Sequence, residues 1–443
     1  MPETTWTDEL LDRAHAAVDL ALKHGADGVW ASTSAMRSTE CQVRDGKLET
    51  MQQSNSRSLS LELYVDGRYF THTTNDLRES QLVGFVKDAV GLTRALERDP
   101  HRELPDPKLF EGRTTVDLQT FDDSVERIDV DRRVATCMAA AERITGKPKV
   151  LSNSTSFTDV RGESAAVSSN GFVGQNRGTY VSMGCSVTMQ DEGDRRPEDG
   201  MWASHRHLAD LPDAAWIADQ ALERAAARLG SKKAPTATTT MVVDRQAVPQ
   251  LIAMLLSPAD GGSIQQGRSF WAERRGKPVL AKRLEIVDDP HLLRATGSRP
   301  YDGEGIATKK RTVIAQGALQ TIFVDTYYAK KLGIAPTTGG WSNIVITPGK
   351  GDVAKLVADA GKGIYVTDWL GGNADDTTGD FSLGLRGHLI DKGRIGAPIG
   401  EMNATGNLLD LFAHVVAIGD DTWTHGWMRA PSMSFAKVSF SGA

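Results

Sequence analysis

The sequence predicts an α+β protein in which a mixed N-terminal domain precedes a β-rich C-terminal domain. Amphipathic helices alternate with hairpins over the first 230 residues, whereas strand-like segments dominate after residue 235. A polar stretch, SKKAPTATTT, separates the two parts and is typical of a linker. We therefore expect an N-terminal α+β domain over residues 1–234, with a central strand meander at about 151–190, and a second domain over residues 235–443.

The first hundred residues predict the order helix, sheet, helix. A helix is expected from an N-cap at Thr7 to a stop at Gly25, with one apolar stripe of Leu10, Ala14, Val18 and Ala21. Two hairpins follow, CQVRDGKLETM and LSLELYVDGRYFTHT, and each turns on Asp-Gly, which tolerates positive φ in a two-residue turn. Residues 77–96 then have the pattern of a second amphipathic helix.

The middle of the chain continues this alternation. The charged, Pro-containing residues 95–114 are interpreted as a connection, and residues 129–145 as a helix. The strand meander has its turn at Asn170–Gly171, and a long helix over residues 213–230 ends at a glycine.

The second half is predicted to be mostly strands. Two strands flank Gln316–Gly317, and a hairpin joins LRGHLI to RIGAPI. We expect its turn to contain three residues, Asp391 to Gly393, with a bulge. Only DRQAVPQLIAMLL and TYYAKKLG stand out as helices.

Composition and charge exclude several functional classes. The 443 residues carry 51 basic and 57 acidic side chains, a net charge of −6, so no basic footprint for nucleic acid is visible. Three cysteines, odd in number and far apart, favour a reducing compartment. The first residues lack the pattern of a signal peptide, and no apolar run has the length of a membrane helix. We expect a cytoplasmic protein that binds neither nucleic acid nor membrane.

The motifs of common catalytic sites are absent from the sequence. None of the ten histidines stands in HExxH or the longer HExxxH, the signatures of zinc proteases, and GxSxG and phosphate-loop motifs are missing too. His205 and His207 form one close pair, which we interpret as solvated surface residues. The three cysteines alternate with apolar neighbours or share helix stripes with them, which predicts core packing for Cys41, Cys137 and Cys185.

Two pairs of charged residues leave alternatives open. Asp302 and Glu304, in PYDGEGIATKK, have the chemistry of an acid and a base, but the pattern favours residues that cap and turn a loop. Arg386 and His388 lie two apart on one predicted strand and so share a face. They have the chemistry to clamp a peptide carboxylate, although a solvated strand face is the simpler interpretation.

An ordered set of phrases resembles a known family. In the second half these are SFWAERRGKPV, SNIVITPG, GDFSLGLRGHLIDKGRIGAPI, ATGNLLDLF and APSMSF, together with a long stretch over residues 284–333. They resemble the C-terminal domain of the TldD/PmbA family, and the two Asp-Gly hairpins resemble its N-terminal domain. The resemblance covers nearly the whole chain and implies an α+β domain followed by a β-rich, barrel-like domain.

The resemblance also implies a function for each of two subtypes. The TldD type is a zinc metallopeptidase with HExxxH and a later cysteine ligand. The PmbA or TldE type lacks the metal site and joins TldD in a heterodimer that cuts unstructured peptides. In this chain the helix that would hold HExxxH reads VPQLIAMLLSPADG, and residues 254–259 in its window include no strong zinc ligand. Pro258 is expected to end that helix.

The later segment, GDDTWTHGWMRAPS, offers Trp423 and His425 but no cysteine. We therefore expect the PmbA or TldE type, with no catalytic residue and no metal ligand in this chain, and zinc on a TldD-type partner. Arg386, His388, Asp302, Glu304 and His425 are candidates for peptide-binding or partner-facing residues. Two other hypotheses stay open: a stand-alone peptide-binding or scaffold homodimer without protease activity, and a metal-independent hydrolase using Asp302, Glu304 or His388.

Overall fold

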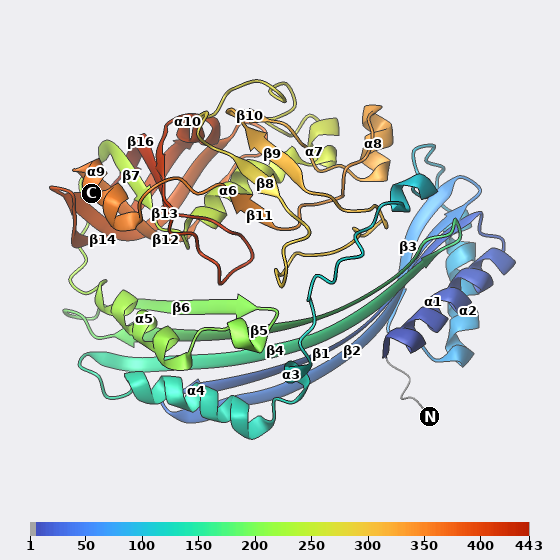
Figure 1. Ribbon diagram of the computed structural model, residues 1–443, viewed down its shortest axis with the longest axis horizontal. Coiled ribbons are helices and arrows are strands. Elements are labelled where there is room, and N and C mark those ends of the chain that lie inside the picture. The colour runs from blue at the N-terminus through green and yellow to red at the C-terminus, as the bar shows by residue number, and fades with distance from the viewer. Residues whose placement is uncertain (1–5, 443) are drawn as a thin grey trace.

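The N-terminal half is built on one curved, six-stranded antiparallel sheet (Figure 1). The computed structural model describes residues 6–442; residues 1–5, where the sequence was examined for a signal peptide, lie outside them. The strand order is β3-β2-β1-β4-β5-β6. The strands are β1 (Gly28–Arg44), β2 (Lys47–Val65), β3 (Arg68–Thr74), β4 (Val150–Ser168), β5 (Val173–Met189) and β6 (Glu198–His205).

The α-helices cover only one face of this sheet. Because side chains alternate along a strand, odd-numbered residues such as Leu61 and Met183 are buried against helices, whereas even-numbered ones such as Ser56 lie on the other face. One apolar core joins α1 and α2 to β1 and β2, and a second joins α4 and α5 to β1, β4, β5 and β6. The helices of this half are α1 (Trp6–Lys23), α2 (Glu79–Arg94), η1 (Pro107–Phe110), α3 (Asp123–Glu126), α4 (Val130–Ile144), η2 (Leu208–Asp210) and α5 (Ala214–Ala226).

The two predicted Asp-Gly turns are confirmed, but the strands beside them are longer than predicted. Asp45–Gly46 and Asp66–Gly67 both have positive φ, as a two-residue hairpin turn requires. The two hairpins share the strand β2, whose middle reads QQSNSRS and therefore lacks the alternation by which a strand is recognised. Two long strands, β4 and β5, occupy the region of the predicted meander and turn at Asn170–Gly171.

The predicted helices of this half are present, with one error in detail. The helices α2, α4 and α5 lie where the periodicity placed them. Thr7 does not cap α1, because the helix already begins at Trp6 and the Thr7 hydroxyl donates to the Glu163 carboxylate of β4. Gly25 follows the end of α1 with φ of 91°, as predicted.

The C-terminal half contains a closed five-stranded barrel, which confirms the predicted fold class. Its strands pair in the order β14-β13-β12-β7-β16, and β14 pairs with β16 to close the ring. Only the pairing of β7 with β12 is parallel. The strands are β7 (Ala237–Val243), β12 (Gly363–Ala374), β13 (Asp380–Asp391), β14 (Arg394–Asn407) and β16 (Met433–Ser441), with β15 (Val415–Ile418) added beside β16.

A small second sheet and several short helices pack around the barrel. The sheet has the order β10-β9-β8-β11, with β8 (Ile286–Asp288), β9 (Arg311–Ala315), β10 (Ala318–Leu319) and β11 (Ile344–Ile346). The predicted helices correspond to α6 and α8, whereas the short helices α7, α9 and α10 were not predicted. The helices are α6 (Val248–Leu256), η3 (Ser257–Ala259), α7 (Gly261–Gln265), α8 (Thr326–Leu332), α9 (Val353–Ala360) and α10 (Leu408–Ala413).

The turn between β13 and β14 is tighter than predicted. Asp391 pairs with Arg394, so the turn contains only Lys392 and Gly393, both with positive φ. A lysine tolerates this conformation here because the two-residue turn matches the twist of the hairpin. The three-residue turn expected from Asp391 to Gly393 is therefore wrong by one residue.

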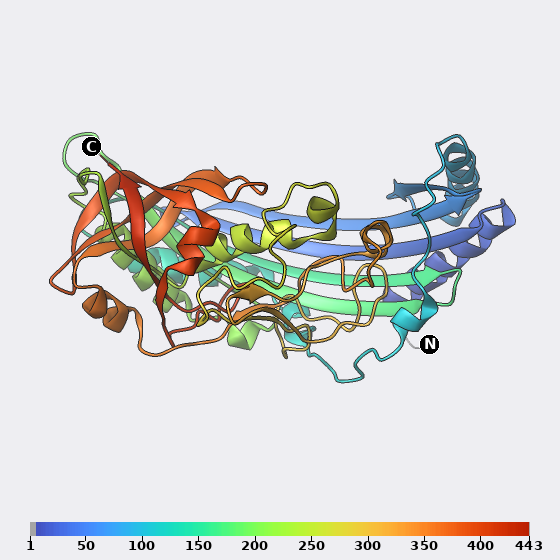
Figure 2. The same ribbon diagram turned by 90° about the horizontal axis from the view of Figure 1, so that it is seen from above.

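The barrel half lies over the helix-free face of the curved sheet (Figures 1 and 2). Residues 95–122, most of which were predicted to be a connection, run from α2 past α8 to α3 and join the two halves on the way. The Tyr327 hydroxyl of α8 donates to Asp99 over 2.8 Å, and the backbone N–H of Arg294 donates to Leu118 O over 2.9 Å. Within residues 6–442, no helix is long and apolar enough to cross a membrane.

A buried ion pair fixes α4 to the sheet. Arg133 donates from Nε and Nη2 to the two carboxylate oxygens of Asp159 over 2.6 and 2.9 Å, and both side chains are buried. Asp159→Ala leaves a guanidinium buried without its partner, so we predict a loss of about 3–5 kcal/mol in the free energy of unfolding. Urea denaturation of both proteins measures this loss in the free energy of unfolding.

The matched control is a pair of the same geometry at the surface. Arg143 on α4 donates to both oxygens of Asp219 on α5 over 2.7 Å, but both side chains are exposed. Asp219→Ala should cost less than about 1 kcal/mol. Equal losses for the two variants would contradict this account of Arg133.

Candidate functional site

The helix α6 occupies the position at which the family resemblance would place HExxxH, and its side chains are mostly apolar. Leu255 and Leu256 are fully buried and belong to the same core as the inward-facing residues of the barrel strands. Met254 packs against this core, and Pro258 is buried. The α-helix ends at Leu256, ahead of Pro258, as predicted. Of residues 254–259 only Ser257 is exposed, so the window offers packing surface and no imidazole, thiolate or carboxylate.

Metal-ligating residues elsewhere in the described chain do not form a binding cluster either. Among residues 6–442, no group of three or more His, Cys, Asp and Glu side chains is placed to hold a metal ion. The three cysteines are fully buried in the core under α4, where Cys137 donates to Cys41 O over 3.6 Å. Burial raises the pKa of the Cys185 thiol to about 12. A thiol held in this state is a poor nucleophile, so the prediction of core packing is confirmed.

His425 belongs to a loop that attaches the barrel half to the sheet. Its Nδ1 lies 2.8 Å from Nε2 of His205 on β6, and its carbonyl oxygen accepts from the Ser204 N–H. Beside them the rings of Trp423 and Trp216 stack with centroids 6.5 Å apart. Burial lowers the pKa of His205 to about 4, and the nearby His425 lowers it in the same direction. The interpretation of His205 as a solvated surface residue is therefore wrong.

Arg386 and His388 also point at the chain itself. Both side chains reach from β13 toward β6 and α5. Arg386 donates to Glu198 O of β6 over 3.4 Å and also lies 3.6 Å from Asp368 on the neighbouring strand β12. Nε2 of His388 lies 3.0 Å from the carbonyl oxygen of Ala227, just after α5. Burial lowers the pKa of His388. The two residues share a face, but that face is a contact between the two halves and not a solvated strand face.

Asp302 and Glu304 shape the loop ahead of β9. The Asp302 carboxylate accepts from the backbone N–H groups of Glu304, Ile306 and Gly339 over 2.9 to 3.2 Å. Glu304 accepts from the N–H and the hydroxyl of Thr326, both over 2.9 Å. Burial raises the pKa of Glu304 to about 7. Both carboxylates thus cap and turn loops, the role that the sequence favoured.

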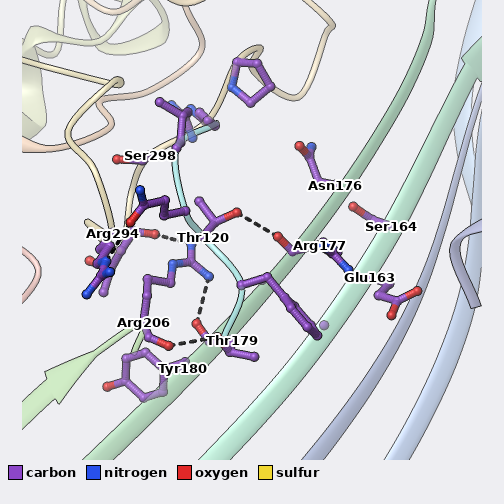
Figure 3. A pocket seen from close by; sticks show the side chains of 18 of the residues that line it. Thr120, Glu163, Ser164, Asn176, Arg177, Thr179, Tyr180, Arg206, Arg294 and Ser298 are labelled. Carbon is purple, nitrogen blue, oxygen red and sulfur yellow. Dashed lines mark hydrogen bonds between the residues drawn. The ribbon is translucent and has the colours of Figure 1, made fainter. Parts of the chain in front are cut away.

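A cavity lies at the junction of the two halves (Figure 3). It has a volume of about 1020 Å³. Its wall comes from β1, β2, β4 and β5 of the sheet, from Arg206 and His207 after β6, from residues 114–121 of the connection, and from the loop at 294–300. None of the five predicted site residues lines it. The charged residues of its lining are Arg177, Arg206, Arg294 and Arg299, with Asp117 and Glu163.

Arg206 connects three parts of this cavity wall. Its guanidinium lies against Gly178 of β5 and donates to the carbonyl oxygens of Thr179 and Thr296. Burial lowers the pKa of Arg206. The sequence does not reveal this role, because no local motif distinguishes a structural arginine from a surface one. The wall is polar and cationic, which suits hydrogen bonding to a polar or anionic ligand.

Comparison with known proteins identifies the class to which this fold belongs. Residues 32–93, 123–229 and 236–442 match models of the PmbA/TldA metallopeptidase domain 1, central domain and C-terminal domain. The fold is thus one of metallopeptidase relatives. The chain belongs to the PmbA/TldD family.

Relatives match over nearly the whole chain. The Metalloprotease PmbA homolog of Haemophilus influenzae is 28% identical and covers 98% of this chain and 96% of its own length. Metalloprotease PmbA of Escherichia coli O157:H7 is 25% identical, and the match covers 94% of this chain and 93% of that protein. A crystal structure from Bacteroides thetaiotaomicron, described as a candidate modulator of DNA gyrase, is 36% identical with a TM-score of 0.96, covering 99% and 100%. TldE from Thermococcus kodakarensis shares the fold, with a TM-score of 0.84 at 17% identity, covering 97% and 100%.

The contact between His205 and His425 predicts a loss of stability in acid. A histidine whose pKa is lowered in the folded state binds fewer protons there than in the unfolded chain, so stability falls as pH drops below about 6.5 toward 4. His205→Gln removes this titration, and its melting temperature should fall less between pH 7 and pH 4 than that of the unmodified chain. His15→Gln, at an exposed position, is the control. Parallel pH profiles for all three chains would contradict the account.

Glu304 predicts a pH effect of the opposite sign. Its raised pKa means that the unfolded chain releases this proton first, so its contribution to stability decreases as pH rises from about 4.5 through 7. Glu304→Gln keeps an acceptor for Thr326 but cannot ionise. We expect its melting temperature, relative to the unmodified chain, to be higher at pH 8 than at pH 5. Glu103→Gln, at an exposed residue paired with Lys330, should show no such gain.

Proposed function

We propose that this chain is the non-catalytic, metal-free subunit of a heterodimeric zinc metallopeptidase of the TldD/TldE type. In this proposal the partner is a TldD-type chain that carries HExxxH and the zinc ion, and the complex degrades or processes unstructured peptides in the cytoplasm. This chain forms part of the wall around the peptide or stabilises the partner. It contributes no residue to the cleavage step.

The observation that carries the proposal is the apolar character of α6. Zinc in proteins is held by imidazole, thiolate or carboxylate groups. In metallopeptidases, two of these ligands usually lie on one face of a helix, and another comes from a later segment. Here the window at residues 254–259 contributes to the barrel core, and the later segment contributes Trp423 and His425 to the contact between the two halves. Installing a metal in this window would require charged groups in place of buried leucines, which costs several kcal/mol per group.

The proposal departs from the printed names of the relatives in one respect. Two relatives carry the name Metalloprotease PmbA. We propose that the metalloprotease activity in that name belongs to the complex and not to this chain alone. The Bacteroides protein is described by a relation to DNA gyrase. We do not extend that description to this chain, because its net charge of −6 does not favour association with DNA.

Peptide recognition in this proposal uses polar surface between the two halves. The cavity lined by arginines and by serine, threonine and asparagine side chains has the hydrogen-bonding groups that a peptide backbone or its terminal carboxylate requires. Binding through backbone groups is tolerant of sequence, as a complex that acts on unstructured chains requires.

The test is the activity of the chain by itself. Purified without any TldD-type relative, it should contain no stoichiometric zinc by elemental analysis and should leave unstructured peptides intact, with or without added Zn²⁺. After addition of a purified HExxxH-bearing relative, the mixture should contain stoichiometric zinc and should cleave the peptides. Zinc-dependent cleavage by the isolated chain would refute the proposal.

A further inference from the structure

The floor of the cavity at the junction is a strip of uncharged side chains that crosses four strands of the sheet. Its first row consists of residues paired from strand to strand, Ser56 of β2, Met36 of β1, Gly162 of β4 and Gly178 of β5. A second row beside it contains Ser34 of β1, Ser164 of β4 and Asn176 of β5. Because neighbouring strands lie about 4.8 Å apart, this floor strip is about 14 Å long, the length of about four residues of an extended chain.

The floor strip offers hydrogen-bonding groups close to the backbone of the sheet. All of its residues have even numbers and therefore lie on the face without α-helices. A Cβ atom added at Gly162 would meet no other atom within 4 Å, so the space above this strand is open. The strip thus presents hydroxyl and amide groups and leaves room for the main chain of a ligand.

One end of the floor strip is cationic. Nη1 of Arg206 occupies the space beside Gly178, where an added Cβ would lie 2.5 Å from it. The guanidinium donates only to the carbonyl oxygens of Thr179 and Thr296, and no carboxylate of residues 6–442 forms an ion pair with it. A guanidinium has further N–H groups for a ligand, and a partly buried cation without an anion favours one.

Arg294 lies close to this end and is held in an unusual backbone conformation. It is two residues from Thr296, and its Nε donates to Oε1 of Gln119 over 2.8 Å. Both Arg294 and Gln119 have positive φ, 59° and 52°, which is uncommon for residues other than glycine. Such strain is common where a structure holds a ligand. The ion pair of Arg294 with Asp210 is exposed, with distances of 3.3 and 3.4 Å, and so leaves the arginine available.

The two acidic residues of the cavity lining do not neutralise the cationic end. The Asp117 carboxylate is exposed and accepts from the N–H of Gln119 over 2.8 Å. The buried Glu163 carboxylate already accepts from the Thr7 hydroxyl and from Arg161. In Figure 3, Ser164 and Asn176 lie on the sheet, whereas Arg206 and Arg294 lie toward the connection and the loop. The cavity therefore has an uncharged floor and one positive end.

We propose that this cavity binds the last residues of an extended peptide, with its terminal α-carboxylate at Arg206 and Arg294 and its backbone along the floor strip. The two oxygens of a carboxylate match two N–H groups of a guanidinium. A peptide with several acidic side chains fits less well, because the floor strip has no cation for them. The inference rests on the proposed function for the kind of ligand, but it concerns this chain without its partner.

The experiment measures binding to the isolated full chain by fluorescence anisotropy. The probe is a hexapeptide of alternating glycine and serine with fluorescein at its N-terminus, prepared with a free C-terminal carboxylate or with a C-terminal amide. The amide should bind at least about tenfold more weakly. A third peptide, an amide with one aspartate in its middle, should bind as weakly as the plain amide.

Variants test the two arginines. Arg294→Gln should reduce the preference for the free carboxylate to about threefold or less, and its fold should persist because the side chain is exposed. Arg206→Gln should have the same effect, and its melting temperature shows whether the wall stays folded. The matched control is Arg132→Gln, at an exposed position of α4 on the opposite face of the sheet, which should keep the full preference.

Equal binding of the acid and the amide, full binding of the amide that contains aspartate, or an unchanged preference in Arg294→Gln would overturn the inference. Such a result would leave the proposed function standing, because cleavage by the complex does not depend on where the peptide terminus is bound. In the same way, a failure of cleavage with the HExxxH-bearing relative would not change the binding measured here. The two tests can therefore fail separately.

Discussion

The fold and the functional interpretation both depend on the packing of one apolar helix against a closed barrel. The side chains of α6 join the inward-facing residues of β7, β12, β13, β14 and β16 in one core. A helix with apolar residues on nearly every side is stable only where it is buried, and α6 shares one core with the barrel strands and the small second sheet. The same packing buries Leu255, Leu256, Pro258 and Ala259 of the window at residues 254–259. A catalytic metal needs the reverse, an open position beside charged ligands.

The second constraint is the attachment of the two halves. The connection at residues 95–122 and the loop that carries Trp423 and His425 each bind the barrel half to the sheet half. Arg206, Arg386 and His388 add charged or polar contacts in the same junction. Of these, Arg206 and part of the connection also line the polar cavity between the halves. In the proposed function, this wall of hydrogen-bonding groups is the surface that the chain contributes around the peptide.

Local chemistry explains what the sequence could predict. The Asp-Gly turns, the helices α2, α4 and α5, and the core position of Cys185 follow from periodicity and turn residues, which act over a few positions. The polar middle of β2 was invisible because its pairing with β1, not its own pattern, makes it a strand. The roles of Arg206 and His205 depend on partners far along the chain, Thr296 and His425, that no local spacing brings together. The family resemblance supplied the barrel, whose closure is a long-range property.

The central claim is that the metal and the cleavage chemistry reside on another chain. Affinity purification of the tagged chain from its native cells, with mass spectrometry of the proteins that co-elute, tests it most directly. The account predicts a stoichiometric relative that carries HExxxH. Elution of this chain alone or only with copies of itself would contradict the account.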